Sequence, residues 1–251
     1  MSIQATFLYD DNLAIERYCA CATNDCAHYC RFNGRIWLLI PKNGCQTICH
    51  SAEAYLGRID DIDVPLNWNR MLRKTTTLSS IIKDRMGEEF VGFYRDPIDR
   101  FVSFVNYTFT QGVPAYVALR KDLHGEEGSP EWKLELMQRV ITYCIYNNST
   151  VNIVNCDQHV LSQYMYVKML TEPSGGFDSL KLYDIKYMRK VLEHEGLTFK
   201  HMNAAEGQLV EKDIPELYKE QIKFIYRDDY KHLLPKVVEP EFLSSIKSVS
   251  M

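Results

Sequence analysis

A short loop near the N-terminal end carries the residue types of an anion-binding site. An apolar segment, residues 36–40, runs into Pro41-Lys42-Asn43-Gly44-Cys45-Gln46-Thr47, where a helix is expected to begin. Backbone N–H groups at such a loop and at a helix N-terminus point towards a bound phosphate, and a lysine adds a full positive charge. Lys42 precedes Gly44 and no Gly-Lys-Ser/Thr ending follows, unlike the nucleoside triphosphate pattern. We therefore expect a phosphorylated nucleotide other than ATP, and the alternative is an ordinary turn between a strand and a helix.

A second apolar segment ends in an arginine that suits the same kind of ligand. Residues 90–94 are followed by Arg95, by Pro97 at the expected first position of a helix, and by Ser103 within that helix. Arg95 would lie at the carboxyl end of a strand, where open α/β sheets bind ligands, and its guanidinium can form paired hydrogen bonds with phosphate. The alternative is that the charges of this segment form only surface ion pairs, Arg95 with Asp99 or Asp96 with Arg100.

The two segments together resemble the sulfotransferase superfamily. The loop 41–47 is similar to the family's loop for the 5′-phosphosulfate of 3′-phosphoadenosine 5′-phosphosulfate (PAPS), although Cys45-Gln46 stands where the family often has a small residue and a second hydroxyl. The other segment, Arg95-Asp96-Pro97-x-x-Arg100-x-x-Ser103-x-x-x-Tyr107, is similar to the segment for the 3′-phosphate. Three further stretches resemble the carbohydrate sulfotransferase branch: Asp157-Gln158-His159-x-x-x-Gln163, His201-Met202-Asn203 and Tyr226-x-x-Asp229-Tyr230.

This resemblance implies a PAPS-dependent enzyme and roles for individual residues. The loop from Pro41 to Thr47 would hold the 5′-phosphate, and Lys42 would stabilise the negative charge that builds on the leaving phosphate during in-line displacement at sulfur. Arg95 and Ser103 would bind the 3′-phosphate, and Asn203 would contact the nucleotide. The product of the cofactor would be adenosine 3′,5′-bisphosphate (PAP), and the expected acceptor is a hydroxyl group, with a carbohydrate favoured by the branch.

The residue that takes the proton of the acceptor hydroxyl is expected to be a histidine. A neutral imidazole suits this role because its unperturbed pKa, about 6.5, lies near working pH. The resemblance favours His159, which follows the apolar residues 151–154. His50 is the main alternative, and Glu53 and His124 stay open as well.

Two other classes of function also stay open. A nucleotide kinase or NTPase with an irregular loop is disfavoured, because no Lys-Ser/Thr ending and no evident strand with a magnesium-binding carboxylate accompany the loop. A binding module that recognises PAPS or a glycan without turnover is the other alternative. It is motivated by Cys45-Gln46 and by the undecided base.

Composition and charge favour one soluble domain that does not bind nucleic acid. The chain has 251 residues, of which 46% are hydrophobic, enough for a sizeable core. Its 29 basic and 33 acidic residues give a net charge of −4 without a long basic run, whereas nucleic-acid binding needs clustered cations. No window approaches the roughly 20 apolar residues of a membrane span, and the first residues lack a leader pattern. We expect a cytoplasmic protein.

Cysteines crowd into the first residues of the chain. Cys19, Cys21, Cys26, His28 and Cys30 are close enough in sequence to hold zinc, but the spacing is not that of a usual zinc knuckle, and reduced thiols are the preferred interpretation, so no metal is assigned. Cys45 lies at the start of the expected loop helix, where a helix N-terminus would lower the pKa of a thiol.

Alternating apolar segments predict the α/β class, a three-layer parallel sheet with helices on both faces. The resemblance implies that this is the P-loop-like sulfotransferase fold. An N-terminal extension is expected over 1–34, a sulfotransferase domain over 35–235 and a tail over 236–251. Expected strands cover 36–40, 89–94, 151–155 and 177–183. Expected helices cover 47–56, 97–109, 114–121, 131–146, 185–195 and 214–233.

Overall fold

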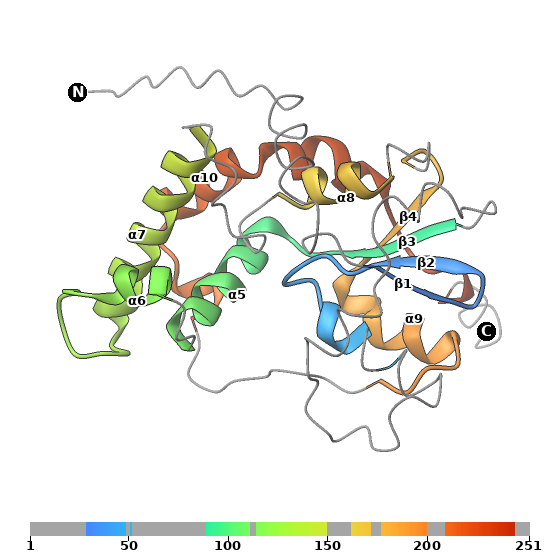
Figure 1. Ribbon diagram of the computed structural model, residues 1–251, viewed down its shortest axis with the longest axis horizontal. Coiled ribbons are helices and arrows are strands. Elements are labelled where there is room, and N and C mark those ends of the chain that lie inside the picture. The colour runs from blue at the N-terminus through green and yellow to red at the C-terminus, as the bar shows by residue number, and fades with distance from the viewer. Residues whose placement is uncertain are drawn as a thin grey trace, which may run out of the picture.

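A five-stranded sheet lies between helices in the computed structural model of the chain (Figure 1). The structure describes residues 29–48, 51, 89–110, 114–149, 162–171, 177–199 and 209–243. Neighbouring strands follow one another in chain order: β1 (Tyr29–Phe32), β2 (Arg35–Leu38), β3 (Glu89–Tyr94), β4 (Leu180–Asp184) and β5 (Val237–Val238). β1 is antiparallel to β2, and β2 to β5 are parallel. The prediction of an α/β protein with a parallel sheet is therefore confirmed.

The first two strands form a hairpin that the sequence analysis did not predict. Asn33 and Gly34 connect them, with φ angles of 52° and 68°. A two-residue turn with positive φ at both positions matches the twist of the strands, and Asn-Gly is its preferred sequence. The Asn33-Gly34 dipeptide therefore indicates the hairpin, and with it β1, from the sequence alone. β1 lies before residue 35 and β5 lies after residue 235. Two strands of the sheet therefore lie outside the expected sulfotransferase domain, 35–235.

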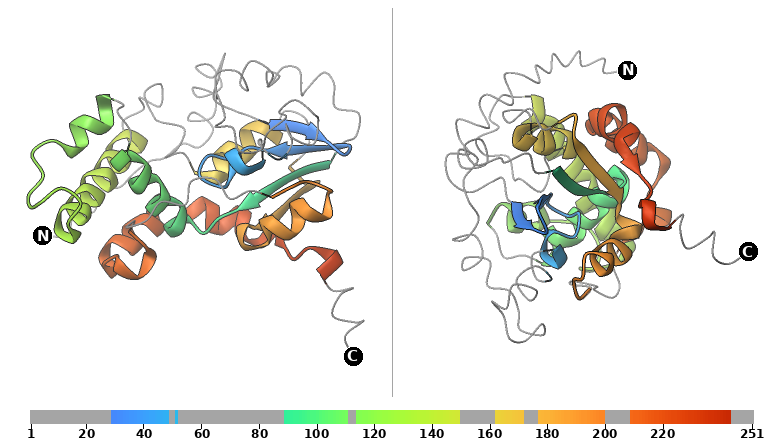
Figure 2. Two further views of the ribbon diagram at one scale, coloured as in Figure 1. Left: turned by 90° about the horizontal axis from the view of Figure 1, so that it is seen from below. Right: turned by 90° about the vertical axis from the view of Figure 1, so that its right-hand side faces the viewer.

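Helices cover both sides of the sheet and form a bundle at one end of it. In Figures 1 and 2, α8 and α9 lie on opposite sides of the strands, and α5, α6, α7 and α10 gather beyond the carboxyl end of β3. One short 3₁₀ segment precedes α9 and another precedes α10. A third follows a π-helical turn, η5 (Asp229–Leu233). No helix in the described ranges combines the length and the apolar character of a membrane span. The α-helices are α5 (Pro97–Thr110), α6 (Pro114–Arg120), α7 (Pro130–Ser149), α8 (Gln163–Thr171), α9 (Met188–His194) and α10 (Glu216–Ile225).

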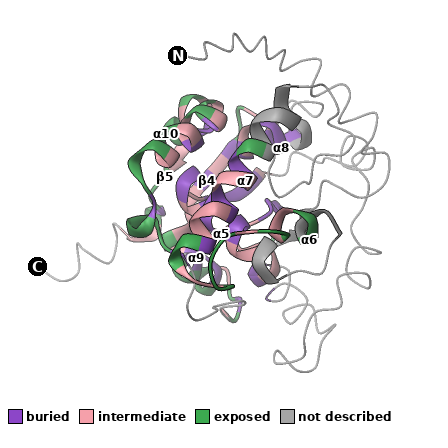
Figure 3. Cartoon of the chain, turned by 90° about the vertical axis from the view of Figure 1, so that its left-hand side faces the viewer, coloured by how far each residue is buried: buried purple, intermediate pink, exposed green. Residues whose placement is uncertain are grey.

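Two apolar clusters hold these parts together. One packs α9, through Met188 and Leu192, against Trp37 and Phe93 of the sheet. The other fills the bundle of α5, α7 and α10 and includes Phe101. Figure 3 shows buried residues towards the middle of the molecule and exposed residues on the outer faces of α9 and α10. The uninterrupted burial of β2 and β3 fits parallel strands that are covered on both faces.

Three helices begin with the same local device. The Asp96 carboxylate accepts a hydrogen bond from Ile98 N at 2.8 Å, Ser129 Oγ from Trp132 N at 3.3 Å, and Ser162 Oγ from Met165 N at 3.1 Å. Each cap satisfies a backbone N–H that has no partner within the helix, and Pro97 and Pro130 then start α5 and α7 with a suitable φ. The cap at Asp96 fixes the start of α5 two residues after Arg95.

Most predicted elements that fall on described residues are found. The strands predicted at 36–40, 89–94 and 177–183 correspond to β2, β3 and β4, and the helices at 97–109, 114–121 and 131–146 to α5, α6 and α7. The segment 185–195 is a 3₁₀ turn followed by α9, and α8 was not predicted. The predicted strand 151–155 lies outside the described residues, as does most of the helix 47–56.

The predicted continuous helix 214–233 is wrong. α10 ends at Ile225, Tyr226 takes φ −105° and ψ 27°, and the chain continues into η5. Asp229 is completely buried, and its carboxylate accepts hydrogen bonds from the N-terminus of α8. In a regular helix, periodicity alone decides which side chains face the interior. Here the wider π turn accompanies the inward position of the Asp229 carboxylate. Such turns often occur at functional sites.

We expect Phe101→Ala to lower the free energy of unfolding by about 3–5 kcal/mol, the usual cost of removing a buried aromatic ring. Phe101 is 1% exposed, and its ring lies 6.2 Å from that of Tyr226 and 6.4 Å from that of Phe104. Phe224→Ala is the matched control, because Phe224 is also on a helix but is 50% exposed. Urea unfolding measures both variants, and equal losses would contradict the packing described for the bundle.

Candidate functional site

The loop after β2 lies against the end of β3, so the two predicted phosphate-binding segments adjoin. Arg95 Nη1 donates to the carbonyl of Lys42 at 3.1 Å, and Arg100 Nε donates to the carbonyl of Pro41 at 3.0 Å. In the other direction, Asn43 Nδ2 donates to the carbonyl of Phe93 at 2.6 Å. Each segment therefore holds the other through side chains that bind backbone carbonyls.

The side chain of Lys42 points to α5. Its Nζ lies 4.3 Å from the centre of the Tyr107 ring, a distance suited to a cation–π interaction. Ser103 lies four residues before Tyr107, so both project from the same face of α5, which is half-buried at these two positions. The structure thus brings Lys42, Arg95 and the helix face of Ser103 together around one loop.

The backbone of the loop adopts a tight conformation at two positions. Lys42 has φ 66° and Gly44 has φ 75°, and Asn43 N donates to the carbonyl of Ile40 at 3.1 Å, which closes the turn. A left-handed conformation at a lysine is uncommon and often marks a functional segment. A Cβ atom at Gly44 would lie 2.4 Å from Cε of Met188, so both the dihedral angle and the packing favour glycine. Thr47, the last residue of the predicted 5′-phosphate loop, is 2% exposed.

The pKa of the Cys45 thiol is raised, not lowered as the helix N-terminus led us to expect. Burial raises the pKa of the Cys45 thiol, and this effect outweighs the opposing effects of the Lys42 charge and of neighbouring backbone N–H groups. The side chain packs at the edge of the cluster formed by the sheet and α9. Cys45 therefore acts as a packed thiol of the loop rather than as a thiolate.

Arg100, which belongs to the predicted 3′-phosphate segment and has a surface pair with Asp96 as its alternative role, is a buried cation. It is 1% exposed, and its guanidinium lies 5.9 Å from the centre of the Tyr226 ring. Among the described residues, Arg95 and Arg100 form no ion pair with a carboxylate, and Arg100 Nη2 has no hydrogen-bond partner. Both arginines are instead anchored to carbonyls of the loop. The alternative of two surface ion pairs is wrong.

Arg95 is partly withdrawn from water. Burial lowers the pKa of its guanidinium, Asp99 opposes this shift, and the charge of Arg100 adds to it. A guanidinium keeps its proton in proteins, so Arg95 stays positively charged. The lowered pKa means that its surroundings are unfavourable for a positive charge. An anionic ligand would remove this electrostatic cost.

Asp229 connects the C-terminal segment to the start of α8. Its carboxylate accepts hydrogen bonds from Gln163 N at 3.1 Å, Tyr164 N at 2.7 Å and Gln163 Nε2 at 3.2 Å. Burial raises its pKa to about 6, against the opposing effects of the Arg100 charge and of these hydrogen bonds. The following residue, Tyr230, donates through its hydroxyl to Asp96 at 3.3 Å. Gln163 and Asp229 had been noted only as parts of the family resemblance, and neither had been assigned to the site.

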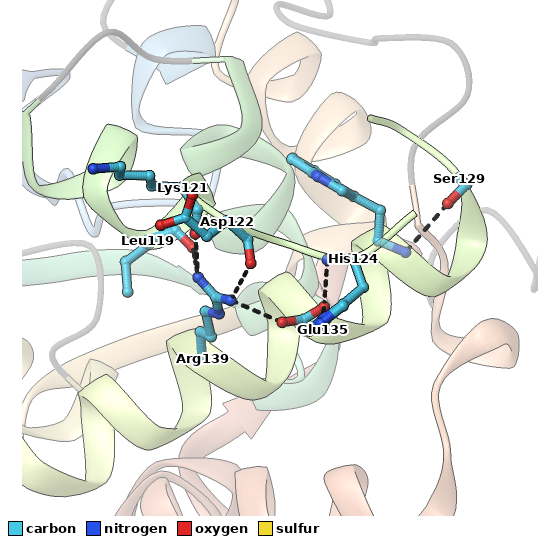
Figure 4. A network of polar contacts seen from close by, with 8 residues as sticks. Leu119, Lys121, Asp122, His124, Ser129, Glu135 and Arg139 are labelled. Atoms are coloured by element: carbon cyan, nitrogen blue, oxygen red, sulfur yellow. Dashed lines mark hydrogen bonds and ion pairs between the residues drawn. The ribbon is translucent and has the colours of Figure 1, made fainter. Parts of the chain in front are cut away.

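His124 lies away from the loop 41–47. Its side chain is 91% exposed. It belongs to the connection between α6 and α7, and this connection lies at the end of the helical bundle far from the sheet (Figures 1 and 2). Its Nδ1 lies 3.0 Å from Glu135 Oε2, and Arg139 binds Glu135 and the carbonyls of the same connection (Figure 4). The hydrogen bond from the backbone N–H of His124 is the main reason that the pKa of Glu135 is lowered, to about 2. This network fixes the connection, so His124 is not a candidate base at the loop.

Several predicted site residues lie outside the described part of the chain. These are His159, Asn203, His50, Glu53 and His201, so the expected base and the expected nucleotide contact of Asn203 stay predictions. The cluster from Cys19 to Cys30 is not described at the level of side chains either. Within the described ranges, no three His, Cys, Asp or Glu side chains are grouped as metal ligands.

Comparisons with protein-family models, with curated proteins and with solved structures found no significant match.

We expect the difference in unfolding free energy between wild type and Asp229→Asn to depend on pH. The folded-state pKa of about 6 exceeds the value of 3.8 for a free side chain, so the folded protein binds this proton more tightly than the unfolded chain does. The contribution of Asp229 to stability is then fully present below pH 4 and is lost as pH rises through 6. Two pKa units correspond to about 3 kcal/mol.

Urea unfolding at pH 4, 5, 6 and 7 measures this effect, and taking the difference between the two proteins removes the titration of all other groups. Asp184→Asn controls for the substitution itself, because Asp184 is a half-buried carboxylate that accepts a hydrogen bond from Lys186 N at 2.9 Å. A difference between wild type and Asp229→Asn that is the same at all four pH values would contradict the raised pKa.

Proposed function

We propose that the chain is a PAPS-dependent sulfotransferase that transfers a sulfuryl group to a hydroxyl acceptor, with a carbohydrate as the favoured class. One observation carries the proposal. Arg95 and Arg100 are both anchored to carbonyls of the loop that carries Lys42, and neither has a carboxylate partner among the described residues. A ligand with two phosphate groups supplies the negative charge that such a concentration of cations requires.

The chemistry of the residues fits this cofactor. The helix after the loop begins at Cys45, so the loop leads directly into a helix N-terminus, the kind of position at which backbone N–H groups and the helix dipole favour a phosphate. Arg95, which follows β3, and Ser103 on α5 would hold the 3′-phosphate. Bound PAPS would supply the sulfuryl group, and PAP would be the leaving group through the oxygen of its 5′-phosphate. The arrangement favours a bisphosphorylated nucleotide over ATP, because no Ser or Thr directly follows the loop lysine, where the nucleoside triphosphate pattern has the hydroxyl that binds magnesium.

Lys42 would act on the charge that develops in the reaction. Its ammonium lies over Tyr107, on the α5 face that also carries Ser103. A side chain with several rotatable bonds can move from this aromatic ring to the bridging oxygen as negative charge builds there, and an interaction that strengthens in the transition state raises the rate. His159 stays the expected acceptor of the hydroxyl proton.

Titration calorimetry of the purified protein with PAP and with ATP and magnesium tests the proposed cofactor. Binding of PAP without binding of ATP is the expected result, and the opposite selectivity would favour a kinase or NTPase. Transfer of labelled sulfate from PAPS to a panel of hydroxyl acceptors then tests turnover. Binding of PAP without any transfer across the panel would favour a binding module.

We expect Arg95→Ala to weaken PAP binding by about 10- to 100-fold, the usual effect of losing a hydrogen bond to a charged group. The affinity for adenosine 5′-monophosphate should change much less, because this nucleotide lacks the 3′-phosphate. Arg139→Ala is the matched control, since Arg139 also donates to backbone carbonyls but lies in the connection between α6 and α7. An equal loss for both nucleotides would show that Arg95 does not bind the 3′-phosphate.

We expect Lys42→Ala to lower the turnover number by about two to three orders of magnitude, because it removes a charge that stabilises the transition state. PAP binding should weaken less than turnover does. Lys186→Ala is the control, because Lys186 lies in a surface ion pair with Asp184. The rate of labelled sulfate transfer measures the effect, and an unchanged rate would remove Lys42 from the mechanism.

A further inference from the structure

The carboxamide of Gln163 joins the two phosphate-binding segments without lying on the surface. Gln163 is completely buried. Its Oε1 accepts hydrogen bonds from Asn43 Nδ2 and, at 3.1 Å, from Arg95 N. Its Nε2 donates to Arg95 O at 2.8 Å and to Asp229 Oδ2 at 3.2 Å. A carboxamide has two acceptor positions and two N–H donors, so all four are used.

Two of these bonds hold the residue after β3 as a neighbouring strand would. Gln163 binds both the N–H and the carbonyl of Arg95, the first residue beyond the end of β3. The paired register of β2 and β3 already ends at Trp37 and Val91. The side-chain amide of Gln163 therefore continues the hydrogen bonding of β3 beyond the end of its pairing with β2. It also fixes the backbone from which the Arg95 guanidinium projects.

The third bond reaches the loop. Asn43 is 1% exposed, and its Nδ2 is shared between the carbonyl of Phe93 and Gln163 Oε1. Asn43 lies between the two residues of the loop with positive φ, Lys42 and Gly44. The hydrogen bonds of the Asn43 side chain therefore hold the loop in place directly before the helix N-terminus that is proposed to bind the 5′-phosphate.

The fourth bond, together with a backbone contact, fixes Gln163 itself. Asp229 Oδ2 accepts hydrogen bonds from both the side chain and the backbone N–H of Gln163. The first residue of α8 is thus oriented by a buried carboxylate from the C-terminal segment, and its side chain has one available direction. Because every partner of the Gln163 carboxamide is fixed, a displacement of the loop also displaces the backbone at Arg95.

We propose that Gln163 is a positioning residue that sets the distance and orientation between the sites for the two phosphates of the nucleotide. This inference rests on the proposed function. Gln163 touches neither phosphate, because both of its donors and both of its acceptors are used within the protein. Its removal affects both phosphates at once, whereas removal of a direct ligand affects one.

Calorimetry with three nucleotides tests the proposal. The ratio of dissociation constants of adenosine 5′-monophosphate and PAP gives the gain from the 3′-phosphate, and that of adenosine 3′-monophosphate and PAP gives the gain from the 5′-phosphate. Gln163→Ala should lower both gains about tenfold, a typical cost of misplaced binding groups. Arg95→Ala should lower chiefly the first gain, and Asn43→Ala chiefly the second.

Ser162→Ala is the matched control, because Ser162 caps the same end of α8 through Met165 N but makes no bond to the loop or to Arg95. Both gains should stay at their wild-type values in this variant. If Gln163→Ala does not fold, as judged by circular dichroism, Asn43→Ala decides, and an unchanged gain from the 5′-phosphate overturns the proposal. Wild-type binding of PAP with Gln163→Ala behaving like Ser162→Ala overturns this inference alone. Absence of PAP binding to the wild type overturns the proposed function and this inference with it.

Discussion

Two completely buried polar side chains, the carboxamide of Gln163 and the carboxylate of Asp229, determine how the end of the sheet is built. Buried polar groups must be hydrogen-bonded, because an unpaired one costs about 1–3 kcal/mol. These two satisfy one another and bind the loop, the backbone after β3 and the N-terminus of α8. The π turn at Asp229 belongs to the same arrangement. Segments that are far apart in sequence are therefore held in one geometry.

This geometry gives the loop an unusual electrostatic environment. Three cations, Lys42, Arg95 and Arg100, lie at or beside it, and the two arginines are held by carbonyl groups. Carbonyl oxygens orient a guanidinium but do not neutralise its charge. The charges of Asp229 and Asp99 act on Arg100 and Arg95, but no carboxylate among the described residues forms an ion pair with either arginine. Two guanidinium groups that are largely withdrawn from water without such a pair favour an anionic ligand.

The sequence was informative about the parts of the site that follow from local pattern. Apolar segments predicted β2 and β3, and because the carboxyl ends of parallel strands meet at one edge of a sheet, it followed that the loop and Arg95 lie close together. The Asn33-Gly34 turn is also a local pattern, since this dipeptide favours a two-residue hairpin. Gln163 and Asp229 are different, since they are 66 residues apart and meet only through tertiary packing. Periodicity placed Asp229 in a regular helix, and local charge pairing placed Arg100 on the surface, because neither pattern contains the buried contacts that decide these positions.

A crystal structure of the protein with bound adenosine 3′,5′-bisphosphate tests the central claim most directly. The account predicts the 5′-phosphate at the backbone N–H groups after Gly44 and the 3′-phosphate at Arg95 and Ser103, with Gln163 still bonded to both segments. A nucleotide bound elsewhere, or one whose two phosphates contact only one of the two segments, would contradict it.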